Sequence, residues 1–251
     1  MKKYSILSIA SGQFDHFLWV FLKSALEKIN LEHVHEICIL NIGLPKESVN
    51  YFEKLNSKIK FIESEKILFS KESWDESWQI NVLEKTKFAK TYLQKQNMPT
   101  YMIDIDCMFL DDIFDLLNIN HKADIILCDR SDLWPGMPFI ASFVAFLNVD
   151  QSINFLDEWI QMMDVVNQFE TKETPALNEL VKKRPNSIKY NLAALSHKIV
   201  GLYYEYLLLP ETKIIHFKGG GFKNDHDSIM DRFDRFKSFN EVINKYIEDK
   251  L

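Results

Sequence analysis

The N-terminal half of the chain alternates between short apolar runs and segments with helical spacing. Strand-like apolar runs occupy residues 4–10, 35–41 and 59–62. A helix is predicted near residues 46–55, between the second and the third of these runs. Between the first two runs, apolar side chains recur every three or four positions, which predicts a first helix with one buried face: Phe14, Phe17, Leu18, Phe21, Ala25 and Ile29. Such alternation predicts parallel strands covered by helices on both faces.

The rest of the chain continues this pattern less regularly. Residues 73–78 have the composition of a loop, and a long helix then runs until Asn97-Met98-Pro99 ends it. Further strands are predicted at 100–106, 123–128, 139–147 and 214–217, and further helices at 149–163 and 239–247. No repeat or linker interrupts the chain. The prediction is one α/β domain over residues 1–251, with a mostly parallel, Rossmann-like sheet, helices on both faces and a mixed C-terminal part.

Composition narrows the possible partners. Hydrophobic residues make up 47% of the 251 positions, which is enough for a packed core. The formal net charge of −6 argues against a nucleic-acid-binding protein, because such proteins carry a basic stripe. It leaves a nucleotide ligand possible, since a metal ion and a few local donors suffice to hold a diphosphate.

The cysteines and the apolar runs bear on the cellular compartment. Cys38, Cys107 and Cys128 each lie in an apolar run, which is typical of buried thiols in a reducing compartment. The apolar start of the chain contains two serines and is read as a first core strand rather than a signal peptide. No run approaches the ~18 apolar residues of a membrane span. We therefore expect a cytoplasmic protein, soluble or peripheral to the membrane.

The sharpest local feature is an acidic strand end. Asp104 and Asp106 follow the apolar strand at residues 100–103, and alternate residues of a strand point to the same side. Two neighbouring carboxylates repel each other unless a cation or a shared proton lies between them. Because hard oxygen ligands suit Mn²⁺ or Mg²⁺, we predict a metal site here, at the strand end where α/β sheets bind ligands. The alternative is a solvated turn.

A second feature is a glycine cluster behind a late strand. The chain has only 7 glycines, and three of them stand together at 219–221. Consecutive glycines expose backbone N–H groups to a phosphate, so Gly219 and Gly220 are candidate diphosphate-binding residues. Lys218 and Lys223 would add positive charge. His216, at the end of the strand, is a candidate third metal ligand, although a lone histidine there is more often structural.

Together these residues resemble the GT-A glycosyltransferases, and most closely the retaining galactosyl- and glucosyltransferases of glycosyltransferase family eight. The strand with Asp104 and Asp106 resembles the family's Asp-x-Asp element, and His216-Phe-Lys-Gly resembles its metal-ligating histidine element. The resemblance covers most of the chain in order. It implies further donor-site residues: Ala10 and Ser11 after the first strand, and Lys87 on the helix before the acidic strand, with Lys85 as the neighbouring candidate.

The chain departs from the family pattern in three places. Ala141-Ser142-Phe143 stands where the family has Asn-Ala-Gly, which removes an asparagine expected near the donor sugar. Glu173-Thr174 stands where the family has Asp-Gln, so a carboxylate is kept and an amide is lost. Phe222-Lys223-Asn224 lies in the region of the family's Lys-Pro-Trp ending.

The resemblance implies transfer of a hexose from a UDP-sugar to a glycan or glycolipid, for example in bacterial surface polysaccharide or lipooligosaccharide synthesis. Residues 1–130 would bind the donor, and residues 131–251 would bind the acceptor and complete the metal site. Glu173 and Asp129 are the candidate catalytic carboxylates, as bases if the reaction inverts the anomeric configuration. A retaining reaction, which the resemblance favours, needs no strong base. Asp129 with Arg130 is equally well explained as a surface ion pair.

Two rival functions use the same residues. Haloacid-dehalogenase phosphatases also have a strand that ends in Asp-x-Asp, with the first aspartate (here Asp104) as nucleophile, but Met108 replaces their usual Thr or Val and the motif lies mid-chain. A non-catalytic nucleotide-sugar-binding protein is the other alternative. The terminal segment from Phe233 to Tyr246 is amphipathic with mixed charge, which favours a helix docked on the domain over contact with a membrane surface.

Overall fold

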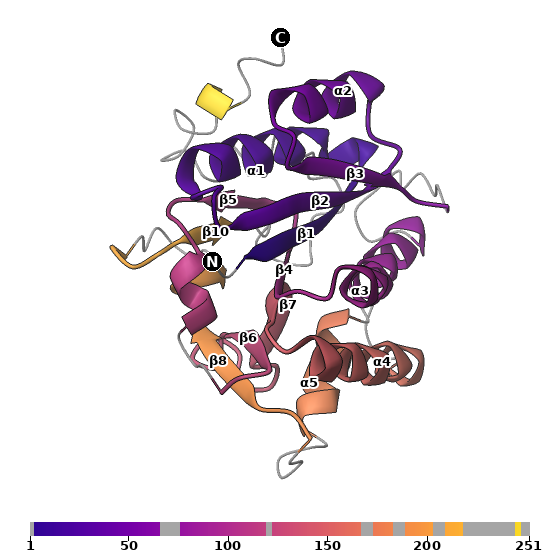
Figure 1. Ribbon diagram of the computed structural model, residues 1–251. Helices are drawn as coiled ribbons and strands as arrows, with labels where there is room; N and C mark the ends of the chain where they lie inside the picture. Colours follow the sequence, from indigo (N-terminus) through magenta and orange to yellow (C-terminus); the bar gives the residue numbers. More distant parts are fainter. Residues whose placement is uncertain are drawn as a thin grey trace.

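The computed structural model describes residues 3–65, 76–118, 122–166, 173–182, 189–202, 209–217 and 244–246. Its centre is a seven-stranded sheet with the order β3-β2-β1-β4-β7-β6-β8, flanked by helices (Figure 1). The strands are β1 (Tyr4–Ser11), β2 (Val34–Ile42), β3 (Ile59–Glu63), β4 (Thr100–Ile103), β6 (Ile125–Asp129), β7 (Phe139–Phe146) and β8 (Leu192–Ser196).

One strand makes the sheet mixed. β1 is parallel to β2 and β4, β2 is parallel to β3, and β6 is parallel to β8. Only β7 runs in the opposite direction, antiparallel to both β4 and β6. The prediction of a mostly parallel α/β sheet is confirmed. Since β1, β4, β6 and β8 point the same way, the segments that follow them emerge at one edge of the sheet, where α/β proteins bind ligands.

Helices cover both faces because successive strand residues point to opposite sides. Tyr101 and Ile103 of β4 join one buried cluster with Phe17 and Phe21, whereas Met102 joins the other. The first face carries α1 (Asp15–Lys28) and α2 (Lys46–Leu55). The second carries α3 (Glu76–Gln96), α4 (Val149–Val165) and α5 (Glu173–Lys182), as Figure 1 shows. Short 3₁₀ helices lie at Gly12–Phe14 and Phe114–Asn118.

A second, three-stranded sheet joins distant parts of the chain. It has the order β5-β10-β9, formed by β5 (Cys107–Phe109), β10 (Ile214–His216) and β9 (Val200–Leu202). β10 pairs antiparallel with β5, so that His216 lies opposite Cys107, and parallel with β9. The small sheet therefore brings His216 beside the segment that contains the two aspartates.

Two of the sequence-based element boundaries need correction. The strand predicted at 100–106 ends at Ile103, because the chain turns at residues 104–106 before β5 begins. Helix α3 begins at Glu76, inside the stretch expected to be a loop. The terminal helix predicted at 239–247 is described only at residues 244–246, which are helical. Strands β8 and β9 were not predicted, and in β8 only Leu195 is buried, so that strand carries no clear hydrophobic pattern.

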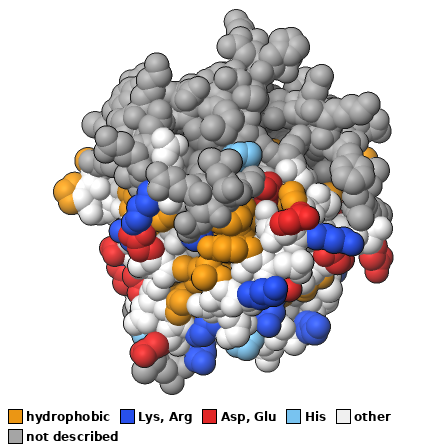
Figure 2. All heavy atoms as spheres, turned by 90° about the horizontal axis from the view of Figure 1, so that it is seen from above, with side chains coloured by type: hydrophobic (Ala, Val, Ile, Leu, Met, Phe, Trp, Pro, Cys, Tyr) orange, Lys and Arg blue, Asp and Glu red, His pale blue; other side chains and the backbone are white. Residues whose placement is uncertain are grey.

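The described surface on the face in Figure 2 carries acidic and basic side chains side by side around a central strip of hydrophobic side chains. No helix among the described residues is both long and apolar enough to cross a bilayer.

Gly201 of β9 is expected to be intolerant of a side chain. Its φ of +115° is one that other residues rarely adopt, and a Cβ there would lie 2.8 Å from Sγ of Cys128. Gly201→Ala should therefore lower the free energy of unfolding by about 1–3 kcal/mol, measured by urea denaturation. Gly136→Ala is the control, because a Cβ at Gly136 meets no atom within 4 Å. Equal stability of the two variants would contradict the prediction.

Candidate active site

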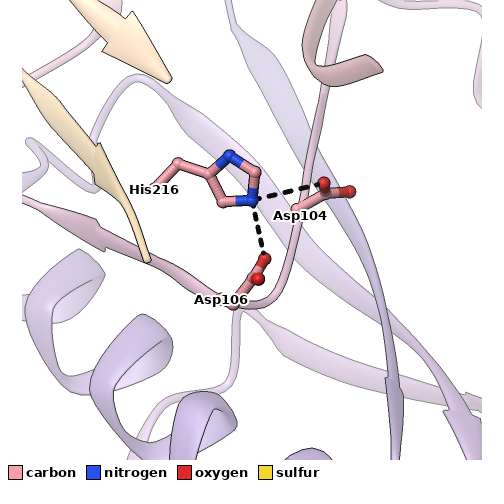
Figure 3. A group of neighbouring side chains, drawn as sticks. All are labelled: Asp104, Asp106 and His216. Carbon is pink, nitrogen blue, oxygen red and sulfur yellow. Dashed lines mark ion pairs between the residues drawn. The ribbon is translucent and has the colours of Figure 1, made fainter. Parts of the chain in front are cut away.

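Asp104, Asp106 and His216 form one cluster at the edge of the sheet (Figure 3). One ligand atom from each lies within 4.8 Å of the others. Nε2 of His216 is 3.1 Å from Oδ1 of Asp106 and 3.7 Å from Oδ2 of Asp104. Among the described residues, this is the only group of three or more such side chains with ligand atoms in reach of a single metal ion.

Two backbone hydrogen bonds and one buried side chain fix the cluster. The N–H of Asp104 donates to the carbonyl of Ser142 on β7 at 2.9 Å, and the N–H of Phe217 donates to the carbonyl of Asp106 at 2.8 Å. Between the aspartates, the side chain of Ile105 is buried in the core. The two carboxylates thus meet through a tight turn and not, as the sequence pattern suggested, as alternate residues of one strand.

The donor set fits a hard divalent cation. Two carboxylates and one imidazole are ligands that Mn²⁺ accepts readily, and Mg²⁺ accepts the oxygens. His216 is buried with its Nε2 edge toward both carboxylates, while its Nδ1 has no hydrogen-bond partner in the described structure. Nε2 is thus the nitrogen available to a metal shared with the aspartates.

Lys85 connects the cluster to a third carboxylate, that of Glu173. Its Nζ hydrogen-bonds and ion-pairs with Oδ1 of Asp104, lies 3.0 Å from Oε1 of Glu173, and donates to the carbonyl of Ala141 at 3.3 Å. The contacts with Asp104 and Ala141 are hydrogen bonds, and the contact with Glu173 is an ion pair. Because Lys85 takes Oδ1 of Asp104, the other oxygen, Oδ2, is the one that faces His216.

Glu173 is the first residue of α5 and is buried, so its charge depends on its neighbours. Burial raises the pKa of Glu173 to about 7; the positive charge of Lys85 opposes this shift, the negative charge of Asp104 adds to it, and the hydroxyl of Thr86 opposes it. For Lys85, burial disfavours the charged form, but Asp104 and Glu173 outweigh it and hold the pKa of Lys85 above its ordinary value. Lys85 is therefore charged throughout the physiological range, while Glu173 titrates near neutrality.

Side-chain contacts with β7 position α5. Beyond the end of β4, the backbone of Phe139 has no strand partner on that side, and Asn178 replaces it: Oδ1 accepts from the N–H of Phe139 at 2.9 Å and Nδ2 donates to its carbonyl at 2.7 Å. The N–H of Ala141 donates to Oγ1 of Thr174 at 3.3 Å. Trp159 donates its indole N–H to the carbonyl of Glu173 at 2.9 Å. These contacts fix Glu173 beside Lys85.

The structure brings Lys85 to the cluster rather than Lys87. The side chain of Lys87 is 49% exposed and pairs with Glu84 at 3.0 Å, whereas that of Lys85 is 3% exposed. The sequence contains a signal for this choice: Lys85 lies three and four positions before Phe88 and Ala89, on the buried stripe of the helix. Lys87 lies off that stripe.

The other predicted site residues lie at the same edge or outside the described residues. Ala10 and Ser11 end β1, next to β4, and a Cβ on the following Gly12 would lie 2.7 Å from the carbonyl oxygen of Gly43. Asp129 ends β6, which β7 separates from β4, and its Oδ1 accepts from the N–H of Ser131 at 2.8 Å. The structure does not bring Asp129 into the metal cluster. Lys218, Gly219, Gly220 and Lys223 lie outside the described residues.

Comparison with known proteins identifies the family. The family model for nucleotide-diphospho-sugar transferases matches residues 46–228, which is more than half of the chain. The chain belongs to this family. No curated protein matches the transferase by sequence. The assignment leaves no support for the phosphatase alternative.

Solved structures show the same fold at low sequence identity. The galactosyltransferase LgtC, in complex with donor and acceptor sugar analogs, is 13% identical, with a TM-score of 0.60 over 95% of both chains. The glycosyltransferase GlyE of Streptococcus pneumoniae TIGR4 is also 13% identical, with a TM-score of 0.61 over 100% of the transferase. The transferase spans 64% of the GlyE chain. The fold is thus the GT-A fold, as the sequence predicted.

Proposed function

We propose that the protein transfers a hexose from a UDP-sugar to a glycan or glycolipid acceptor and requires a divalent cation, Mn²⁺ or Mg²⁺. The observation that carries this proposal is the cluster of Asp104, Asp106 and His216, at the ligand-binding edge of a nucleotide-diphospho-sugar transferase fold. Residues 1–130 supply most of the donor-binding side, and residues 131–251 supply the acceptor side and complete the metal and diphosphate site. The three free, buried cysteines are consistent with the reducing environment of the cytoplasm. The proposed role there is in the synthesis of bacterial surface polysaccharide or lipooligosaccharide.

The chemistry follows from charge. When the nucleotide diphosphate leaves, negative charge grows on the phosphates and positive charge grows at the anomeric carbon. Oδ2 of Asp104, the carboxylate of Asp106 and Nε2 of His216 would hold a divalent cation, which when bound would stabilise the charge on the leaving diphosphate. Ser11, Gly219, Gly220, Lys218 and Lys223 are proposed to bind the nucleotide and its phosphates. Preorganised groups of this kind are usually the largest source of rate enhancement.

The carboxylate of Glu173 is proposed to stabilise the positive charge that develops on the sugar. Lys85 forms ion pairs with both Asp104 and Glu173. These contacts hold the proposed metal ligand, Asp104, at a fixed distance from Glu173, the carboxylate proposed to face the sugar. A retaining outcome fits this arrangement better than an inverting one, because Glu173 is engaged by Lys85 and Asp129 lies two strands from β4. The phosphate would then accept the acceptor's proton.

The proposal is tested by incubating the protein with a panel of nucleotide sugars and Mn²⁺. We expect a UDP-hexose to raise the melting temperature and to be hydrolysed slowly in the absence of acceptor, since water replaces the acceptor. Binding without hydrolysis of any donor would favour the non-catalytic alternative. Release of phosphate from a generic phosphomonoester would contradict the proposal.

Removal of divalent cations is expected to abolish the activity. With excess EDTA the rate should fall at least ~10²-fold, because the leaving diphosphate then lacks its main charge neutraliser. The measurement is the rate of UDP release, with Mn²⁺ added back beyond the chelator to restore it. A rate that persists in excess chelator would overturn the metal role.

A further inference from the structure

The edge of β7 that faces β4 is only partly covered by a strand. β4 pairs with β7 from Phe146 to Phe143 and ends at Ile103, where the chain turns toward the metal cluster. Residues 139–141 of β7 therefore have no strand neighbour on that side among the described strands. Because buried backbone groups need hydrogen-bond partners, side chains have to complete this edge.

Side chains from two helices supply those partners. Asn178 binds both backbone groups of Phe139: its Oδ1 accepts from the N–H at 2.9 Å, and its Nδ2 donates to the carbonyl at 2.7 Å. At Ala141, the N–H donates to Oγ1 of Thr174 at 3.3 Å, and the carbonyl accepts from Nζ of Lys85 at 3.3 Å. Thr174 and Asn178 lie one turn apart on the same face of α5, so the helix takes the place of β4 along this stretch.

The same contacts set where Glu173 lies along β7. Glu173 precedes Thr174 in the first turn of α5, and its Oε1 is 3.0 Å from Nζ of Lys85. Asn178 also donates to the carbonyl of Thr174 at 2.8 Å, which links its contact with Phe139 to that first turn. A helix rises about 1.5 Å per residue, and a misplacement of about 1 Å at a reacting group can cost about 10²-fold in rate. The seating of α5 on β7 therefore matters for the carboxylate that is proposed to face the sugar.

We propose that Asn178 is a positioning residue for the transfer reaction: it completes the edge of β7 in place of β4 and thereby holds Glu173 beside Lys85 and Asp104. Asn178 acts through Glu173 and has no contact of its own with the donor or the acceptor. The inference rests on the proposed function of Glu173, and it deepens that function by naming the residue that fixes the carboxylate.

The test is a double-mutant cycle on the full chain with Asn178→Ala, Glu173→Gln and the double variant, assayed with Mn²⁺ and the matched UDP-hexose. We expect Asn178→Ala to lower kcat about tenfold and to leave the donor KM within about threefold, since no proposed metal ligand is changed. In the Glu173→Gln background, the same change should lower kcat by less than about twofold, because the residue through which Asn178 acts has already lost its charge.

Asn148→Ala is the matched control. Asn148 is the N-cap of α4 and accepts from the N–H of Gln151 at 3.4 Å, so its replacement also costs stability. It lies at the opposite edge of the sheet, because β7 ends at Phe146, which pairs with Thr100, the first residue of β4. We expect Asn148→Ala to lower the melting temperature and to leave kcat within about twofold of wild type.

A second variant covers the case that Asn178→Ala does not fold. Thr174→Val removes the acceptor of the Ala141 N–H, keeps the shape of the side chain and weakens the same seating of α5 on β7. It should lower kcat about threefold in the wild type and leave it unchanged in Glu173→Gln. It then replaces Asn178→Ala in the cycle.

Two kinetic results would overturn the inference: an unchanged kcat in Asn178→Ala, or an equal fold loss of kcat in the wild-type and Glu173→Gln backgrounds, as expected of a residue that only stabilises the fold. If no UDP-hexose is turned over, the proposed function has failed, and urea denaturation of the same four proteins decides about Asn178. Its replacement should then lower the urea midpoint more in the wild type than in Glu173→Gln, because only the wild type has the ion pair with Lys85 to lose. An equal fall in both backgrounds would contradict the inference without any assay of activity.

Discussion

Asp106→Asn is expected to lower kcat/KM for sugar transfer by at least ~10²-fold and to leave the fold intact. Asparagine has the same shape but no charge, and the other carboxylate of the cluster, Asp104, already shares its charge with Lys85. A cation at this cluster would then face little net negative charge and bind weakly. The measurements are steady-state kinetics across a Mn²⁺ titration and thermal melting with and without Mn²⁺.

The melting experiment separates a metal ligand from a structural residue. A ligand that binds only the folded state stabilises it by about 2.7 kcal/mol at 100 times its Kd, so Mn²⁺ should raise the melting temperature of the wild type but not of Asp106→Asn. Without metal, the variant should melt at the same or a higher temperature, because repulsion between the aspartates is relieved. Asp115→Asn, an exposed carboxylate 3.3 Å from Lys213, is the control and should behave as wild type. A destabilised Asp106→Asn with full Mn²⁺-dependent activity would show a structural role.

Glu173→Gln is expected to lower kcat by ~10²-fold or more while the donor affinity changes little. A carboxylate that faces the sugar matters most when positive charge develops, and glutamine cannot supply that charge. If Glu173 acted only as an acid at the N-terminus of α5, its replacement would cost at most ~1 kcal/mol of stability and leave kcat within a few-fold of wild type. Steady-state kinetics with the matched donor, together with the donor Kd, decide between the two. The matched control is Glu179→Gln, a half-exposed acid on the same helix that pairs with Lys182.

The pH dependence provides an independent check on Glu173. Because the pKa of Glu173 is raised to about 7, the wild-type kcat should rise with pH through about 7 as the carboxylate ionises, and Glu173→Gln should lose that limb. Stability should change in the opposite sense. Because the pKa of Glu173 is higher in the folded than in the unfolded state, this group stabilises the protein fully at pH values below about 4.5, its unfolded pKa. That stabilisation is lost as the pH rises through about 7. Urea denaturation from pH 4.5 to 8 should therefore show a fall in the wild type that is smaller in the variant.

The sequence predicted most helices and strands well, because the hydrophobic period of such an element is a property of neighbouring residues. Residues 4–10, 35–41 and 59–62 were expected to be strands, and β1, β2 and β3 lie there within about a residue or two at each end. Helix α4 was predicted at 149–163 and extends from Val149 to Val165. Burial of one face of a helix, or of both faces of a strand, determines which nearby positions are apolar. This hydrophobic pattern predicts the element without knowledge of what packs against it.

The sequence could not determine how distant segments meet. Thr100–Ile103 pairs with a strand that runs in the opposite direction, and the end of that pairing decides where the turn at residues 104–106 begins. The choice of Lys85 over Lys87 was signalled by helical spacing, but its two carboxylate partners were not. Contacts such as Lys85 with Glu173 depend on how α3 and α5 pack on the same face of the sheet, and local periodicity does not encode that packing.

By itself, then, the sequence determined the α/β class, the residue types of a candidate metal site at Asp104, Asp106 and His216, and the resemblance to GT-A enzymes. Only the tertiary structure decided that these three side chains converge, since His216 reaches the aspartates through the pairing of β10 with β5. It also decided that Lys85 links Asp104 to Glu173. The reason is physical: hydrophobic periodicity records which side of an element is buried, whereas a site is assembled by strand register and packing between segments far apart in the chain.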